Sequence, residues 1–252
     1  MITIKSPQDI ERMRAAGKVV EDTLNLLGDS VRVGITTEEL NRIADAYIRS
    51  QGAFPTFLHY NGYPKSICIS VNEEVVHGIP GKRRIKDGDI VSCDVGATLN
   101  GFVGDAARTY LVGNVAPETV ELVKVTKECF FEGLKFCRVG YRISDISKAI
   151  QSYAESHGYG VVRELVGHGV GRVLHEDPEV PNFYSPRARQ RLEAGMTIAI
   201  EPMINLGTAK VWQLDDGWTV TTQDGKPSAH YENSVAITDG DPILLTCSEA
   251  FV

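Results

Sequence analysis

The predicted secondary structure follows the same order twice along the chain, and this repetition constrains the fold more than any other feature. Each round consists of two helices followed by short strands rich in β-branched residues. A shift of 106 residues aligns identical residues around the second helix of each round: Arg32, Val33, Gly34, Tyr47, Ser50 and Gly52 align with Arg138, Val139, Gly140, Tyr153, Ser156 and Gly158. Coincidence can produce a few identities, but we interpret these as an internal duplication. Residues 1–252 would then form a single domain with halves at about 1–113 and 114–252, and a site can form where the two sheets meet.

Capping residues mark the helices of the first round. Ser6 is a cap with Asp9 in the first turn, and Thr36 forms a capping box with Glu39. The predicted helices are Pro7 to about Gly28, Thr36 to before Gly52, about Pro117 to Phe136, and Ser144 to His157; the predicted strands are Ser66 to Val71, Asp89 to Ala97, Phe102 to Val112, and several from Val161 onward. The sequence therefore predicts an α/β (α+β) fold, with each half a helix pair backed by antiparallel strands.

Charge and the amino terminus exclude several classes of protein. The net charge of −7 argues against an extended nucleic-acid surface, which requires clustered Lys and Arg. The one dense basic run, Lys82, Arg83, Arg84 and Lys86, lies between turn residues, so we expect a solvated loop, with a contact to ribosomal RNA as the alternative. No signal-peptide core and no run near the roughly 18 apolar residues of a membrane span is present, which predicts a soluble, cytoplasmic protein with no membrane partner.

The cysteines favour a reducing compartment. The five residues, Cys68, Cys93, Cys129, Cys137 and Cys247, are odd in number and never spaced as C-x-x-C. This pattern predicts reduced thiols rather than a disulfide framework or a zinc knuckle. At least three of them are expected to be small core residues.

Two carboxylates can be placed on one face of a predicted hairpin. Asn100-Gly101 is the strongest two-residue hairpin signal in the chain. Pairing Leu99 with Phe102 across it makes Asp94 and Asp105 diagonal neighbours, at about 7–8 Å between backbones, and such a pair can hold ions between its oxygens. The alternative for each Asp is an ordinary turn or strand-end residue, but an unpaired carboxylate in the apolar run around Asp94 would be costly to bury.

Three further candidate ligands come from the second round. His168 lies in the glycine-rich run Gly167–Gly171, where we expect a turn with space beside the imidazole. Glu201 precedes Pro202 at the end of an apolar strand, which predicts an edge or bulge that redirects the side chain, and Glu232 lies in a run that predicts a half-buried strand. A structural role is the alternative for each. Four carboxylates and one imidazole suit a pair of divalent ions, so the chain is predicted to be a two-metal hydrolase.

Two other metal or nucleotide motifs fail in this region. A dinucleotide-binding loop would need glycine at position 172, which is Arg172. A single-zinc H-E-x-x-H helix beginning at His175 would need histidine at position 179, which is Glu179, and Pro178 would interrupt the helix.

Seven motifs, spread in order over essentially the whole chain, resemble those of type I methionine aminopeptidases of peptidase family M24. They are Val76-His77-Gly78-Ile79-Pro80, Cys93-Asp94-Val95-Gly96, Gly104-Asp105-Ala106-Ala107-Arg108-Thr109, Gly167-His168-Gly169, His175-Glu176, Glu201-Pro202-Met203 and Asp216-Gly217-Trp218. The resemblance implies a pita-bread fold of two pseudo-symmetric halves around a central dimetal site, in the short bacterial form. It also implies removal of the initiator methionine from nascent proteins when the second residue is small.

The resemblance assigns a role to each candidate. Two divalent ions (Co, Mn, Fe or Zn) are implied, with Asp94 chelating one ion, His168 and Glu201 binding the other, and Asp105 and Glu232 bridging both. A hydroxide held between the ions would attack the first peptide carbonyl, and Glu201 would carry the proton to the leaving amine. His77 and His175 would orient the peptide and stabilise the oxyanion, with a structural histidine as the alternative for each.

The same resemblance implies a shallow apolar pocket for the methionine side chain. Its walls would be Phe57, Tyr60, Tyr63, Cys68, Leu174 and Trp218, where a thioether can meet aromatic edges. Without the resemblance these residues would be assigned to the core. Phe57 and Leu174 stand where common family members carry Cys and Phe, and Asn233 replaces a frequent His, so the pocket shape and the reaction rate stay open.

Three alternative functions are weighed. A non-catalytic pita-bread protein would usually have lost metal ligands, and an Xaa-Pro peptidase commonly carries an additional amino-terminal domain that 252 residues cannot hold. A cysteine hydrolase built on Cys68 and His77 is the third alternative. The partners implied are nascent polypeptide amino termini and, secondarily, the ribosome; we expect a monomer that binds no specific nucleic acid.

Overall fold

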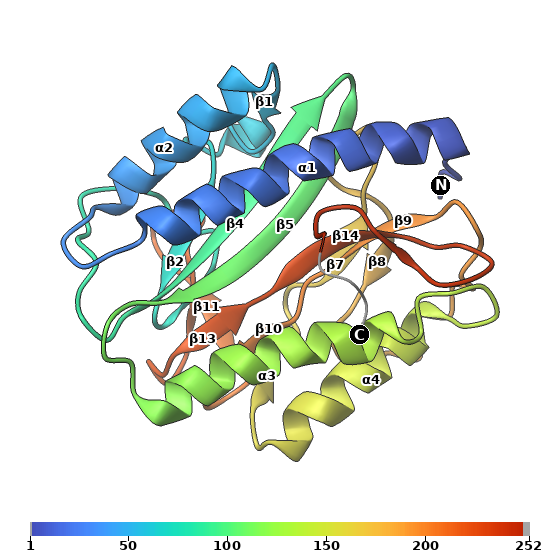
Figure 1. The fold of residues 1–252 in the computed structure, drawn as a ribbon. Helices are drawn as coiled ribbons and strands as arrows, with labels where there is room; N and C mark the ends of the chain where they lie inside the picture. Colours follow the sequence, from blue (N-terminus) through green and yellow to red (C-terminus); the bar gives the residue numbers. More distant parts are fainter. Residues whose placement is uncertain (1, 249–252) are drawn as a thin grey trace.

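The computed structural model describes residues 2–248 and consists of two helix pairs packed on one face of a sheet. The helices are α1 (Pro7–Ser30), α2 (Thr37–Ser50), α3 (Pro117–Leu134) and α4 (Ile143–Ser156), with a short 3-10 turn at Tyr60–Gly62. In Figure 1, α1 and α2 lie beside the strands of the first half, and α3 and α4 lie beside those of the second half. Among residues 2–248, none of the helices is both long and apolar enough to cross a membrane.

The strands form one large antiparallel sheet and two small ones. The large sheet has the order β1-β4-β5-β14-β9-β7-β8, with β2 paired to β4 and β15 paired to β14. Its strands are β1 (Phe54–Pro55), β2 (Cys68–Val71), β4 (Ile90–Leu99), β5 (Phe102–Leu111), β7 (Gly167–Gly169), β8 (Glu176–Val180), β9 (Thr197–Ile200), β14 (Glu232–Ala236) and β15 (Ile243–Leu244). The small sheets are β13 (Ser228–His230), β10 (Met203–Asn205) and β6 (Gly160–Val161), and β11 (Val211–Gln213), β12 (Val220–Thr222) and β3 (Glu74–Val76). The halves therefore join within one continuous sheet, at the pairing of β5 with β14.

The predicted starts of the first three helices are confirmed, and α4 starts one residue before the predicted Ser144. The ends of α1 and α3 each differ by two residues from the prediction, because α3 ends at Leu134 rather than Phe136 and α1 passes Gly28. Ser6 and Thr36 both form complete capping boxes, with Asp9 and Glu39 as their partners. Gly28 does not end α1, which continues to Ser30. The Tyr110 ring packs against Gly28, and a Cβ there would lie 3.0 Å from a ring carbon, so this glycine serves close packing inside the helix. The helices α2 and α4 occupy residues 37–50 and 143–156, a shift of 106 residues, but the assignment of a single domain with duplicated halves stays a prediction.

The hairpin prediction is confirmed to the residue. Leu99 pairs with Phe102, and the turn residues Asn100 and Gly101 both have positive φ, at 51° and 78°. This is the backbone conformation that an Asn-Gly two-residue turn favours. Because the register is fixed from the turn, Asp105 lies opposite Gly96, one step diagonally from Asp94.

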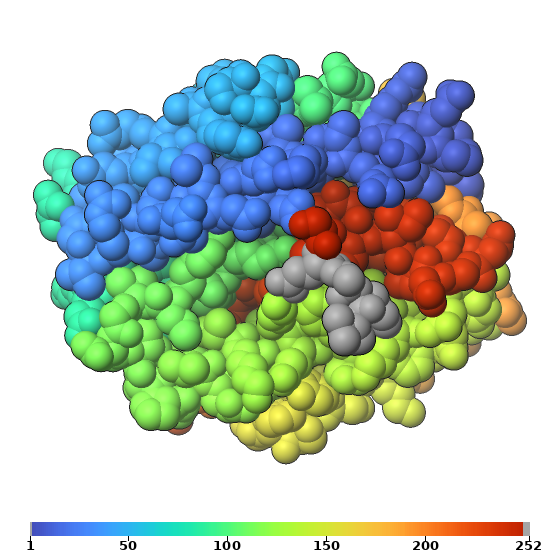
Figure 2. All heavy atoms as spheres, in the orientation of Figure 1, coloured from blue at the N-terminus to red at the C-terminus, as the bar shows by residue number. Residues whose placement is uncertain are grey.

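Four clusters of buried apolar side chains hold the fold together, and the smallest, around Val76, Met203 and Val220, joins residues of the two small sheets. The other three are larger. One packs α1 and α2 on the strands of the first half, a second packs α3 and α4 on those of the second half, and a third combines residues of both halves around Phe57 and Leu174. The carboxyl-terminal segment also binds the halves together. In Figure 2 the part of this segment drawn in red, which ends at residue 248, lies between α1 and the second helix pair, and a Cβ on Gly17 of α1 would lie 1.8 Å from the Leu245 carbonyl oxygen.

The cysteine and basic-run predictions can be compared with this fold. All five cysteines lie in the described part of the chain, all are free, and four are buried, as predicted. The basic run forms a loop in which Lys82 and Lys86 are exposed. Arg83 forms an ion pair with Glu74 at 2.8 Å and Arg84 donates to the carbonyl of Gly34, so only part of this run is free to meet a partner. The ribosomal contact stays a prediction.

Candidate metal centre and active site

Four of the five predicted metal ligands lie on neighbouring strands, and the fifth directly follows the end of another strand of the same sheet. Asp94, Asp105 and Glu232 lie on β4, β5 and β14, Glu201 follows the last residue of β9, and His168 lies on β7. These strands are consecutive in the large sheet, in the order β4-β5-β14-β9-β7. The sheet therefore brings together side chains that are up to 138 positions apart in the sequence (Asp94 to Glu232).

The ligand atoms on the His168 side lie close enough for a shared cation. His168 Nε2 is 3.6 Å from Asp105 Oδ2 and 3.5 Å from Glu201 Oε1. One potential ligand atom each from Asp105, His168 and Glu232 lie within 4.8 Å of one another. Divalent ions hold oxygen and nitrogen ligands at about 2.0–2.2 Å, so atoms with this separation need only small side-chain movements to meet on one ion.

The backbone presents His168 in the form that binds metals. Its Nδ1 lies 2.8 Å from the Gly169 carbonyl oxygen, which can only accept a hydrogen bond. Nδ1 therefore carries the proton and Nε2 offers a lone pair to the carboxylates. Burial is the main cause that lowers the pKa of His168 to about 3, which keeps the ring neutral.

The prediction of a flexible glycine turn around His168 is wrong. Gly167–Gly169 is a strand, and neither glycine has a positive φ. A Cβ at Gly169 would lie 2.1 Å from the Asp177 carbonyl oxygen, and one at Gly167 would lie 2.4 Å from the Ala199 carbonyl oxygen. The glycines are required because adjacent chain segments approach closely, which fixes His168 rather than freeing it.

The carboxylates create an environment that is unfavourable without a cation. Burial raises the pKa of Asp94 to about 7, and burial together with neighbouring carboxylates raises the pKa of Asp105, Glu201 and Glu232 well above their usual values. In residues 2–248, seven buried polar side-chain atoms have no hydrogen-bond partner, and four of them belong to Asp94, Asp105, Glu232 and His230. Bound cations would relieve both the repulsion and the missing partners.

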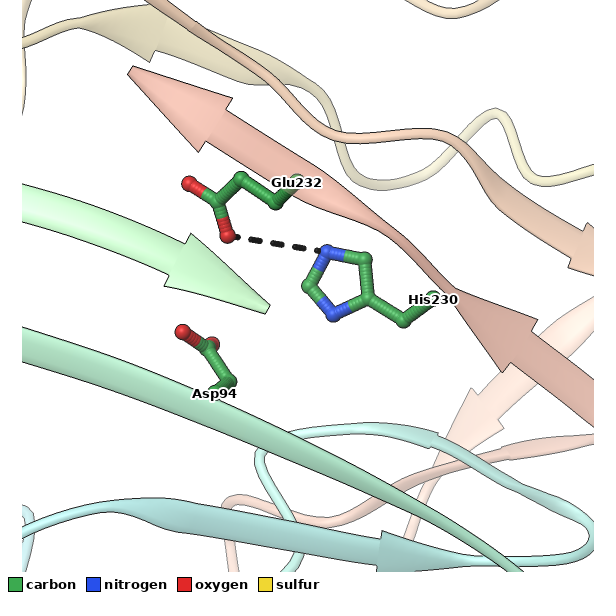
Figure 3. A group of neighbouring side chains, drawn as sticks. All are labelled: Asp94, His230 and Glu232. Atoms are coloured by element: carbon green, nitrogen blue, oxygen red, sulfur yellow. Dashed lines mark ion pairs between the residues drawn. The ribbon is translucent and has the colours of Figure 1, made fainter. Parts of the chain in front are cut away.

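His230 is part of the cluster and was missed by the sequence reasoning. It ends β13, two residues before Glu232, and one potential ligand atom each from Asp94, His230 and Glu232 lie within 4.8 Å. Figure 3 shows Asp94 and Glu232 approaching the His230 ring from two strands, with Glu232 Oε2 3.7 Å from Nε2. The signal that could have found it is the spacing of two, which places side chains of an extended segment on the same face.

Glu232 and Asn233 are more buried than expected. All five residues of β14 are buried, so the prediction of a half-buried strand is wrong: β5 and β9 flank β14 on both sides. Asn233 Oδ1 accepts hydrogen bonds from the Arg108 guanidinium at 2.7 Å and from the Thr246 hydroxyl at 3.1 Å. The residue that replaces a frequent family histidine is thus used to fasten β14.

A cavity of about 310 Å³ lies over the carboxylates, and every predicted site residue lines it. These are Asp94, Asp105, His168, Glu201 and Glu232, the histidines His77 and His175, and Phe57, Tyr60, Tyr63, Cys68, Leu174 and Trp218. Val76 and Met203 also line it; they belong to two of the quoted motifs, although no role was assigned to them. Asn61, Glu164, Leu165 and Val166 line it as well, and nothing in their local sequence distinguished them from core or loop residues. The volume is at the small end of ligand pockets, which span roughly 300–1,000 Å³.

Aromatic contacts position the two cavity histidines. The Tyr60 hydroxyl lies 2.8 Å from His175 Nδ1, and the His175 ring meets the His168 ring edge-on at 4.2 Å between centroids. His77 has φ of 60°, a strained conformation for a residue with a Cβ, and its ring meets Trp218 edge-on at 6.5 Å. Burial lowers the pKa of His77 to about 4, so it is a neutral hydrogen-bonding group.

The cysteine alternative is not supported by this geometry. Cys68 is 5% exposed, and burial together with the negative charge of Asp94 raises the pKa of its thiol. A cysteine nucleophile requires the opposite shift, which a nearby positive charge would produce.

The chain matches known proteins over nearly its whole length. Residues 11–239 match the model of metallopeptidase family M24. A methionine aminopeptidase from Clostridium perfringens is 55% identical over 98% of this chain and 99% of that protein, and methionine aminopeptidase 1 from Bacillus subtilis is 50% identical over 98% and 99%. The crystal structure of methionine aminopeptidase from Rickettsia prowazekii has a TM-score of 0.96 at 42% identity, covering 98% of this chain and all of that one. A prolidase from Pyrococcus furiosus shares the fold at 22% identity, with a TM-score of 0.80 and 66% of its length covered.

Proposed function

This chain belongs to the methionine aminopeptidases of metallopeptidase family M24 and has their pita-bread fold, and we propose that it removes the initiator methionine of nascent polypeptides whose second residue is small. The observation that supports this most is the meeting of five ligand side chains, on or directly after five consecutive strands, beneath an apolar cavity. The requirement for a small second residue follows from the family. We place the reaction in the cytoplasm, where nascent amino termini appear, and treat the ribosome as a further partner.

The donor set fits two divalent ions. Oxygen donors with one imidazole suit Mn, Fe, Co or Zn. Asp94, Asp105 and Glu232 each have a buried oxygen without a hydrogen-bond partner, and each belongs to a group of residues whose potential ligand atoms lie within 4.8 Å of one another. We assign Asp94 to one ion, His168 and Glu201 to the other, and Asp105 and Glu232 to both. When bound, such ions acidify water and polarise a peptide carbonyl.

Glu201 is assigned the proton transfer. Its carboxylate lies beside His168, and burial, with Glu232 and Asp94 nearby, raises its pKa well above the usual value. A carboxyl group in such surroundings can hold a proton near neutral pH and pass it to the leaving amine.

His77 and His175 are assigned to the scissile peptide. We assign the Tyr60 hydroxyl as the donor in its 2.8 Å contact with His175 Nδ1; His175 then carries its proton on Nε2, where it can donate to a developing oxyanion. His77, neutral and held above the cavity by its fixed backbone, can orient the peptide. The substrate's methionine would enter between Phe57 and Leu174, where a flexible thioether packs well against apolar and aromatic walls.

The test is metal reconstitution with three peptides. Metal-free protein is supplied with Mn, Fe, Co or Zn singly and assayed on Met-Ala-Ser, Ala-Pro-Ser and Met-Lys-Ser. We expect cleavage of Met-Ala-Ser with at least one of the ions, and little of the other two. Equal cleavage of all three, or full activity in strong chelator, would refute the proposal; cleavage of Ala-Pro-Ser alone would indicate an Xaa-Pro peptidase.

A further inference from the structure

His230 has a buried ring nitrogen that nothing in residues 2–248 satisfies. The residue is 2% exposed, and its Nε2 has no hydrogen-bond partner. The nearest acidic oxygens are Glu232 Oε2 at 3.7 Å and Glu201 Oε2 at 3.9 Å, both too distant for a hydrogen bond. A buried polar atom in this position requires a partner that can lie between the nitrogen and the carboxylates.

Two neighbouring carboxylates also carry an oxygen without a hydrogen-bond partner. Asp94 Oδ1 and Glu232 Oε1 also lack partners, and potential ligand atoms of these two residues and of His230 lie within 4.8 Å of one another. Figure 3 shows the three side chains around a common gap. Ligand atoms at about 2.0–2.2 Å from one ion lie no more than about 4.4 Å apart, so one cation could satisfy all three with small rotations.

Neighbouring strands hold the main chain of His230 in place. The His230 N–H donates to the Thr109 hydroxyl at 3.0 Å, and the same hydroxyl donates to the His230 carbonyl at 2.8 Å. His230 also pairs with Met203 in the small sheet. These contacts from β5 and β10 fix the His230 main chain, and the side chain starts from this fixed position beside the carboxylates.

We propose that His230 binds, through Nε2, the divalent ion held by Asp94 and Glu232. The inference rests on the two-ion centre of the proposed function and adds an imidazole to the ion that would otherwise have only carboxylate ligands. Each ion would then carry one imidazole, His168 on one and His230 on the other. Since imidazole favours Fe, Co and Zn and carboxylates favour Mn, the His230 ion should prefer Co or Zn over Mn.

The competing role is a hydrogen bond from His230 to a liganding carboxylate. In that arrangement glutamine could replace histidine, because its amide also donates. Losing an outer hydrogen bond typically weakens metal binding about 10–100-fold, whereas losing a direct nitrogen ligand should weaken it more and remove a coordinated imidazole. The variant His230→Gln therefore separates the two roles.

The experiment is a Co(II) titration of the full-length, metal-free protein, followed by calorimetry and by NMR of exchangeable, strongly shifted imidazole N–H signals. We expect two such signals in the wild type at two equivalents, and one in each of His230→Gln and His168→Gln. In His230→Gln one Co(II) equivalent should bind at least about 100-fold more weakly, with a smaller loss for Mn(II). The matched control is His157→Gln, at the exposed end of α4, which should match the wild type.

The outcomes separate this inference from the proposed function. A wild type with two bound Co(II) ions and one imidazole signal, or His230→Gln with unchanged affinity and signals, overturns the His230 assignment even if methionine peptides are cleaved. Binding of only one Co(II) contradicts the two-ion centre, and loss of its imidazole signal in His230→Gln would still establish His230 as a ligand. If His230→Gln does not fold, the number of signals in the wild type decides.

Discussion

The two halves of the molecule deliver their ligands to the same cavity by different means. Asp94 and Asp105 come from one hairpin, where a single two-residue turn sets the register between them. His168, Glu201 and Glu232 come from separate short strands, whose positions depend on pairings with β5 and with one another. The hairpin side is therefore locally determined, whereas the return side, made by β7, β9 and β14, depends on long-range packing. Changes on the return side should disturb the metal centre more than changes at the hairpin turn.

The largest expected effect is the loss of activity when one metal-binding carboxylate is removed from either side, which would show that the reaction needs both sides. Asp105→Ala from the hairpin side and Glu201→Ala from the return side should each lower kcat/KM on Met-Ala-Ser by about a thousandfold or more, which corresponds to about 4 kcal/mol of barrier. Each removes a carboxylate within 3.6 Å of His168 Nε2. Cys68→Ala, which alters only a wall of the cavity, should cost less than about tenfold. Near-normal activity of Glu201→Ala would show that this carboxylate of the return side is not needed for the reaction.

A pair of glycine variants tests the difference directly. Gly169→Ala places a Cβ 2.1 Å from the Asp177 carbonyl, so β7 and β8 must shift, at about 3 kcal/mol of folding free energy, and His168 moves with them. Gly101→Ala puts an L-residue at φ of 78° but meets no atom within 4 Å, and should cost about 1 kcal/mol. Denaturant unfolding and metal titration measure both. Only Gly169→Ala should weaken metal binding; equal metal affinities in the two variants would contradict the comparison.

This difference explains what could be predicted from the sequence. The hairpin could be predicted to the residue because Asn100-Gly101 fixes a local register. The pairing of Glu232 with Ala107 spans 125 positions and is set by the packing of the whole sheet, so the burial of β14 was underestimated. The capped helices, in contrast, follow from short-range signals.

The site itself was predicted in composition but not in geometry. The motif resemblance supplied residues that all line one cavity, yet it carried no position for His230, which lies on a small sheet, whereas Glu232 lies on the large one. Nor could local sequence show that the glycines beside His168 accommodate close neighbouring backbone, because the contacts come from Asp177 and Ala199. Such contacts depend on tertiary structure, which spacing alone does not describe.

Removal of the metal should lower the folding stability of the protein, by an amount that depends on pH. In the metal-free protein burial raises the pKa of Asp94 from 3.8 to about 7, so between these values the folded state retains a proton that the unfolded state has lost. Its contribution to stability is full below pH 3.8 and is lost as the pH rises to about 7. The raised pKa values of Asp105 and Glu232 act in the same direction.

Thermal unfolding in chelator and in excess Mn(II) measures this effect. The melting temperature in chelator should fall between pH 5 and pH 7.5, because the buried carboxylates lose their protons. The increase in melting temperature that Mn(II) produces should grow over the same pH range, to about 5–10 °C at a Mn(II) concentration near 100 times Kd. The variant Asp94→Asn should reduce the fall in chelator. A metal gain that is equal at both pH values would mean that these carboxylates do not bind the ion.

The smallest expected effect concerns the apolar wall that the return side provides. Leu174 is 4% exposed and belongs to the loop between β7 and β8, which Glu176 fastens by accepting a hydrogen bond from the Arg172 N–H at 2.8 Å and by pairing with the buried Lys5. Leu174→Ala should raise KM for Met-Ala-Ser about tenfold with little change in kcat, because it removes contacts with the methionine side chain and none with the reacting groups. Leu214→Ala, at an exposed site outside the cavity, is the matched control. If kcat instead falls while KM is unchanged, Leu174 acts by positioning the neighbouring His175, and the return side then governs the chemistry through this loop as well as through its metal ligands.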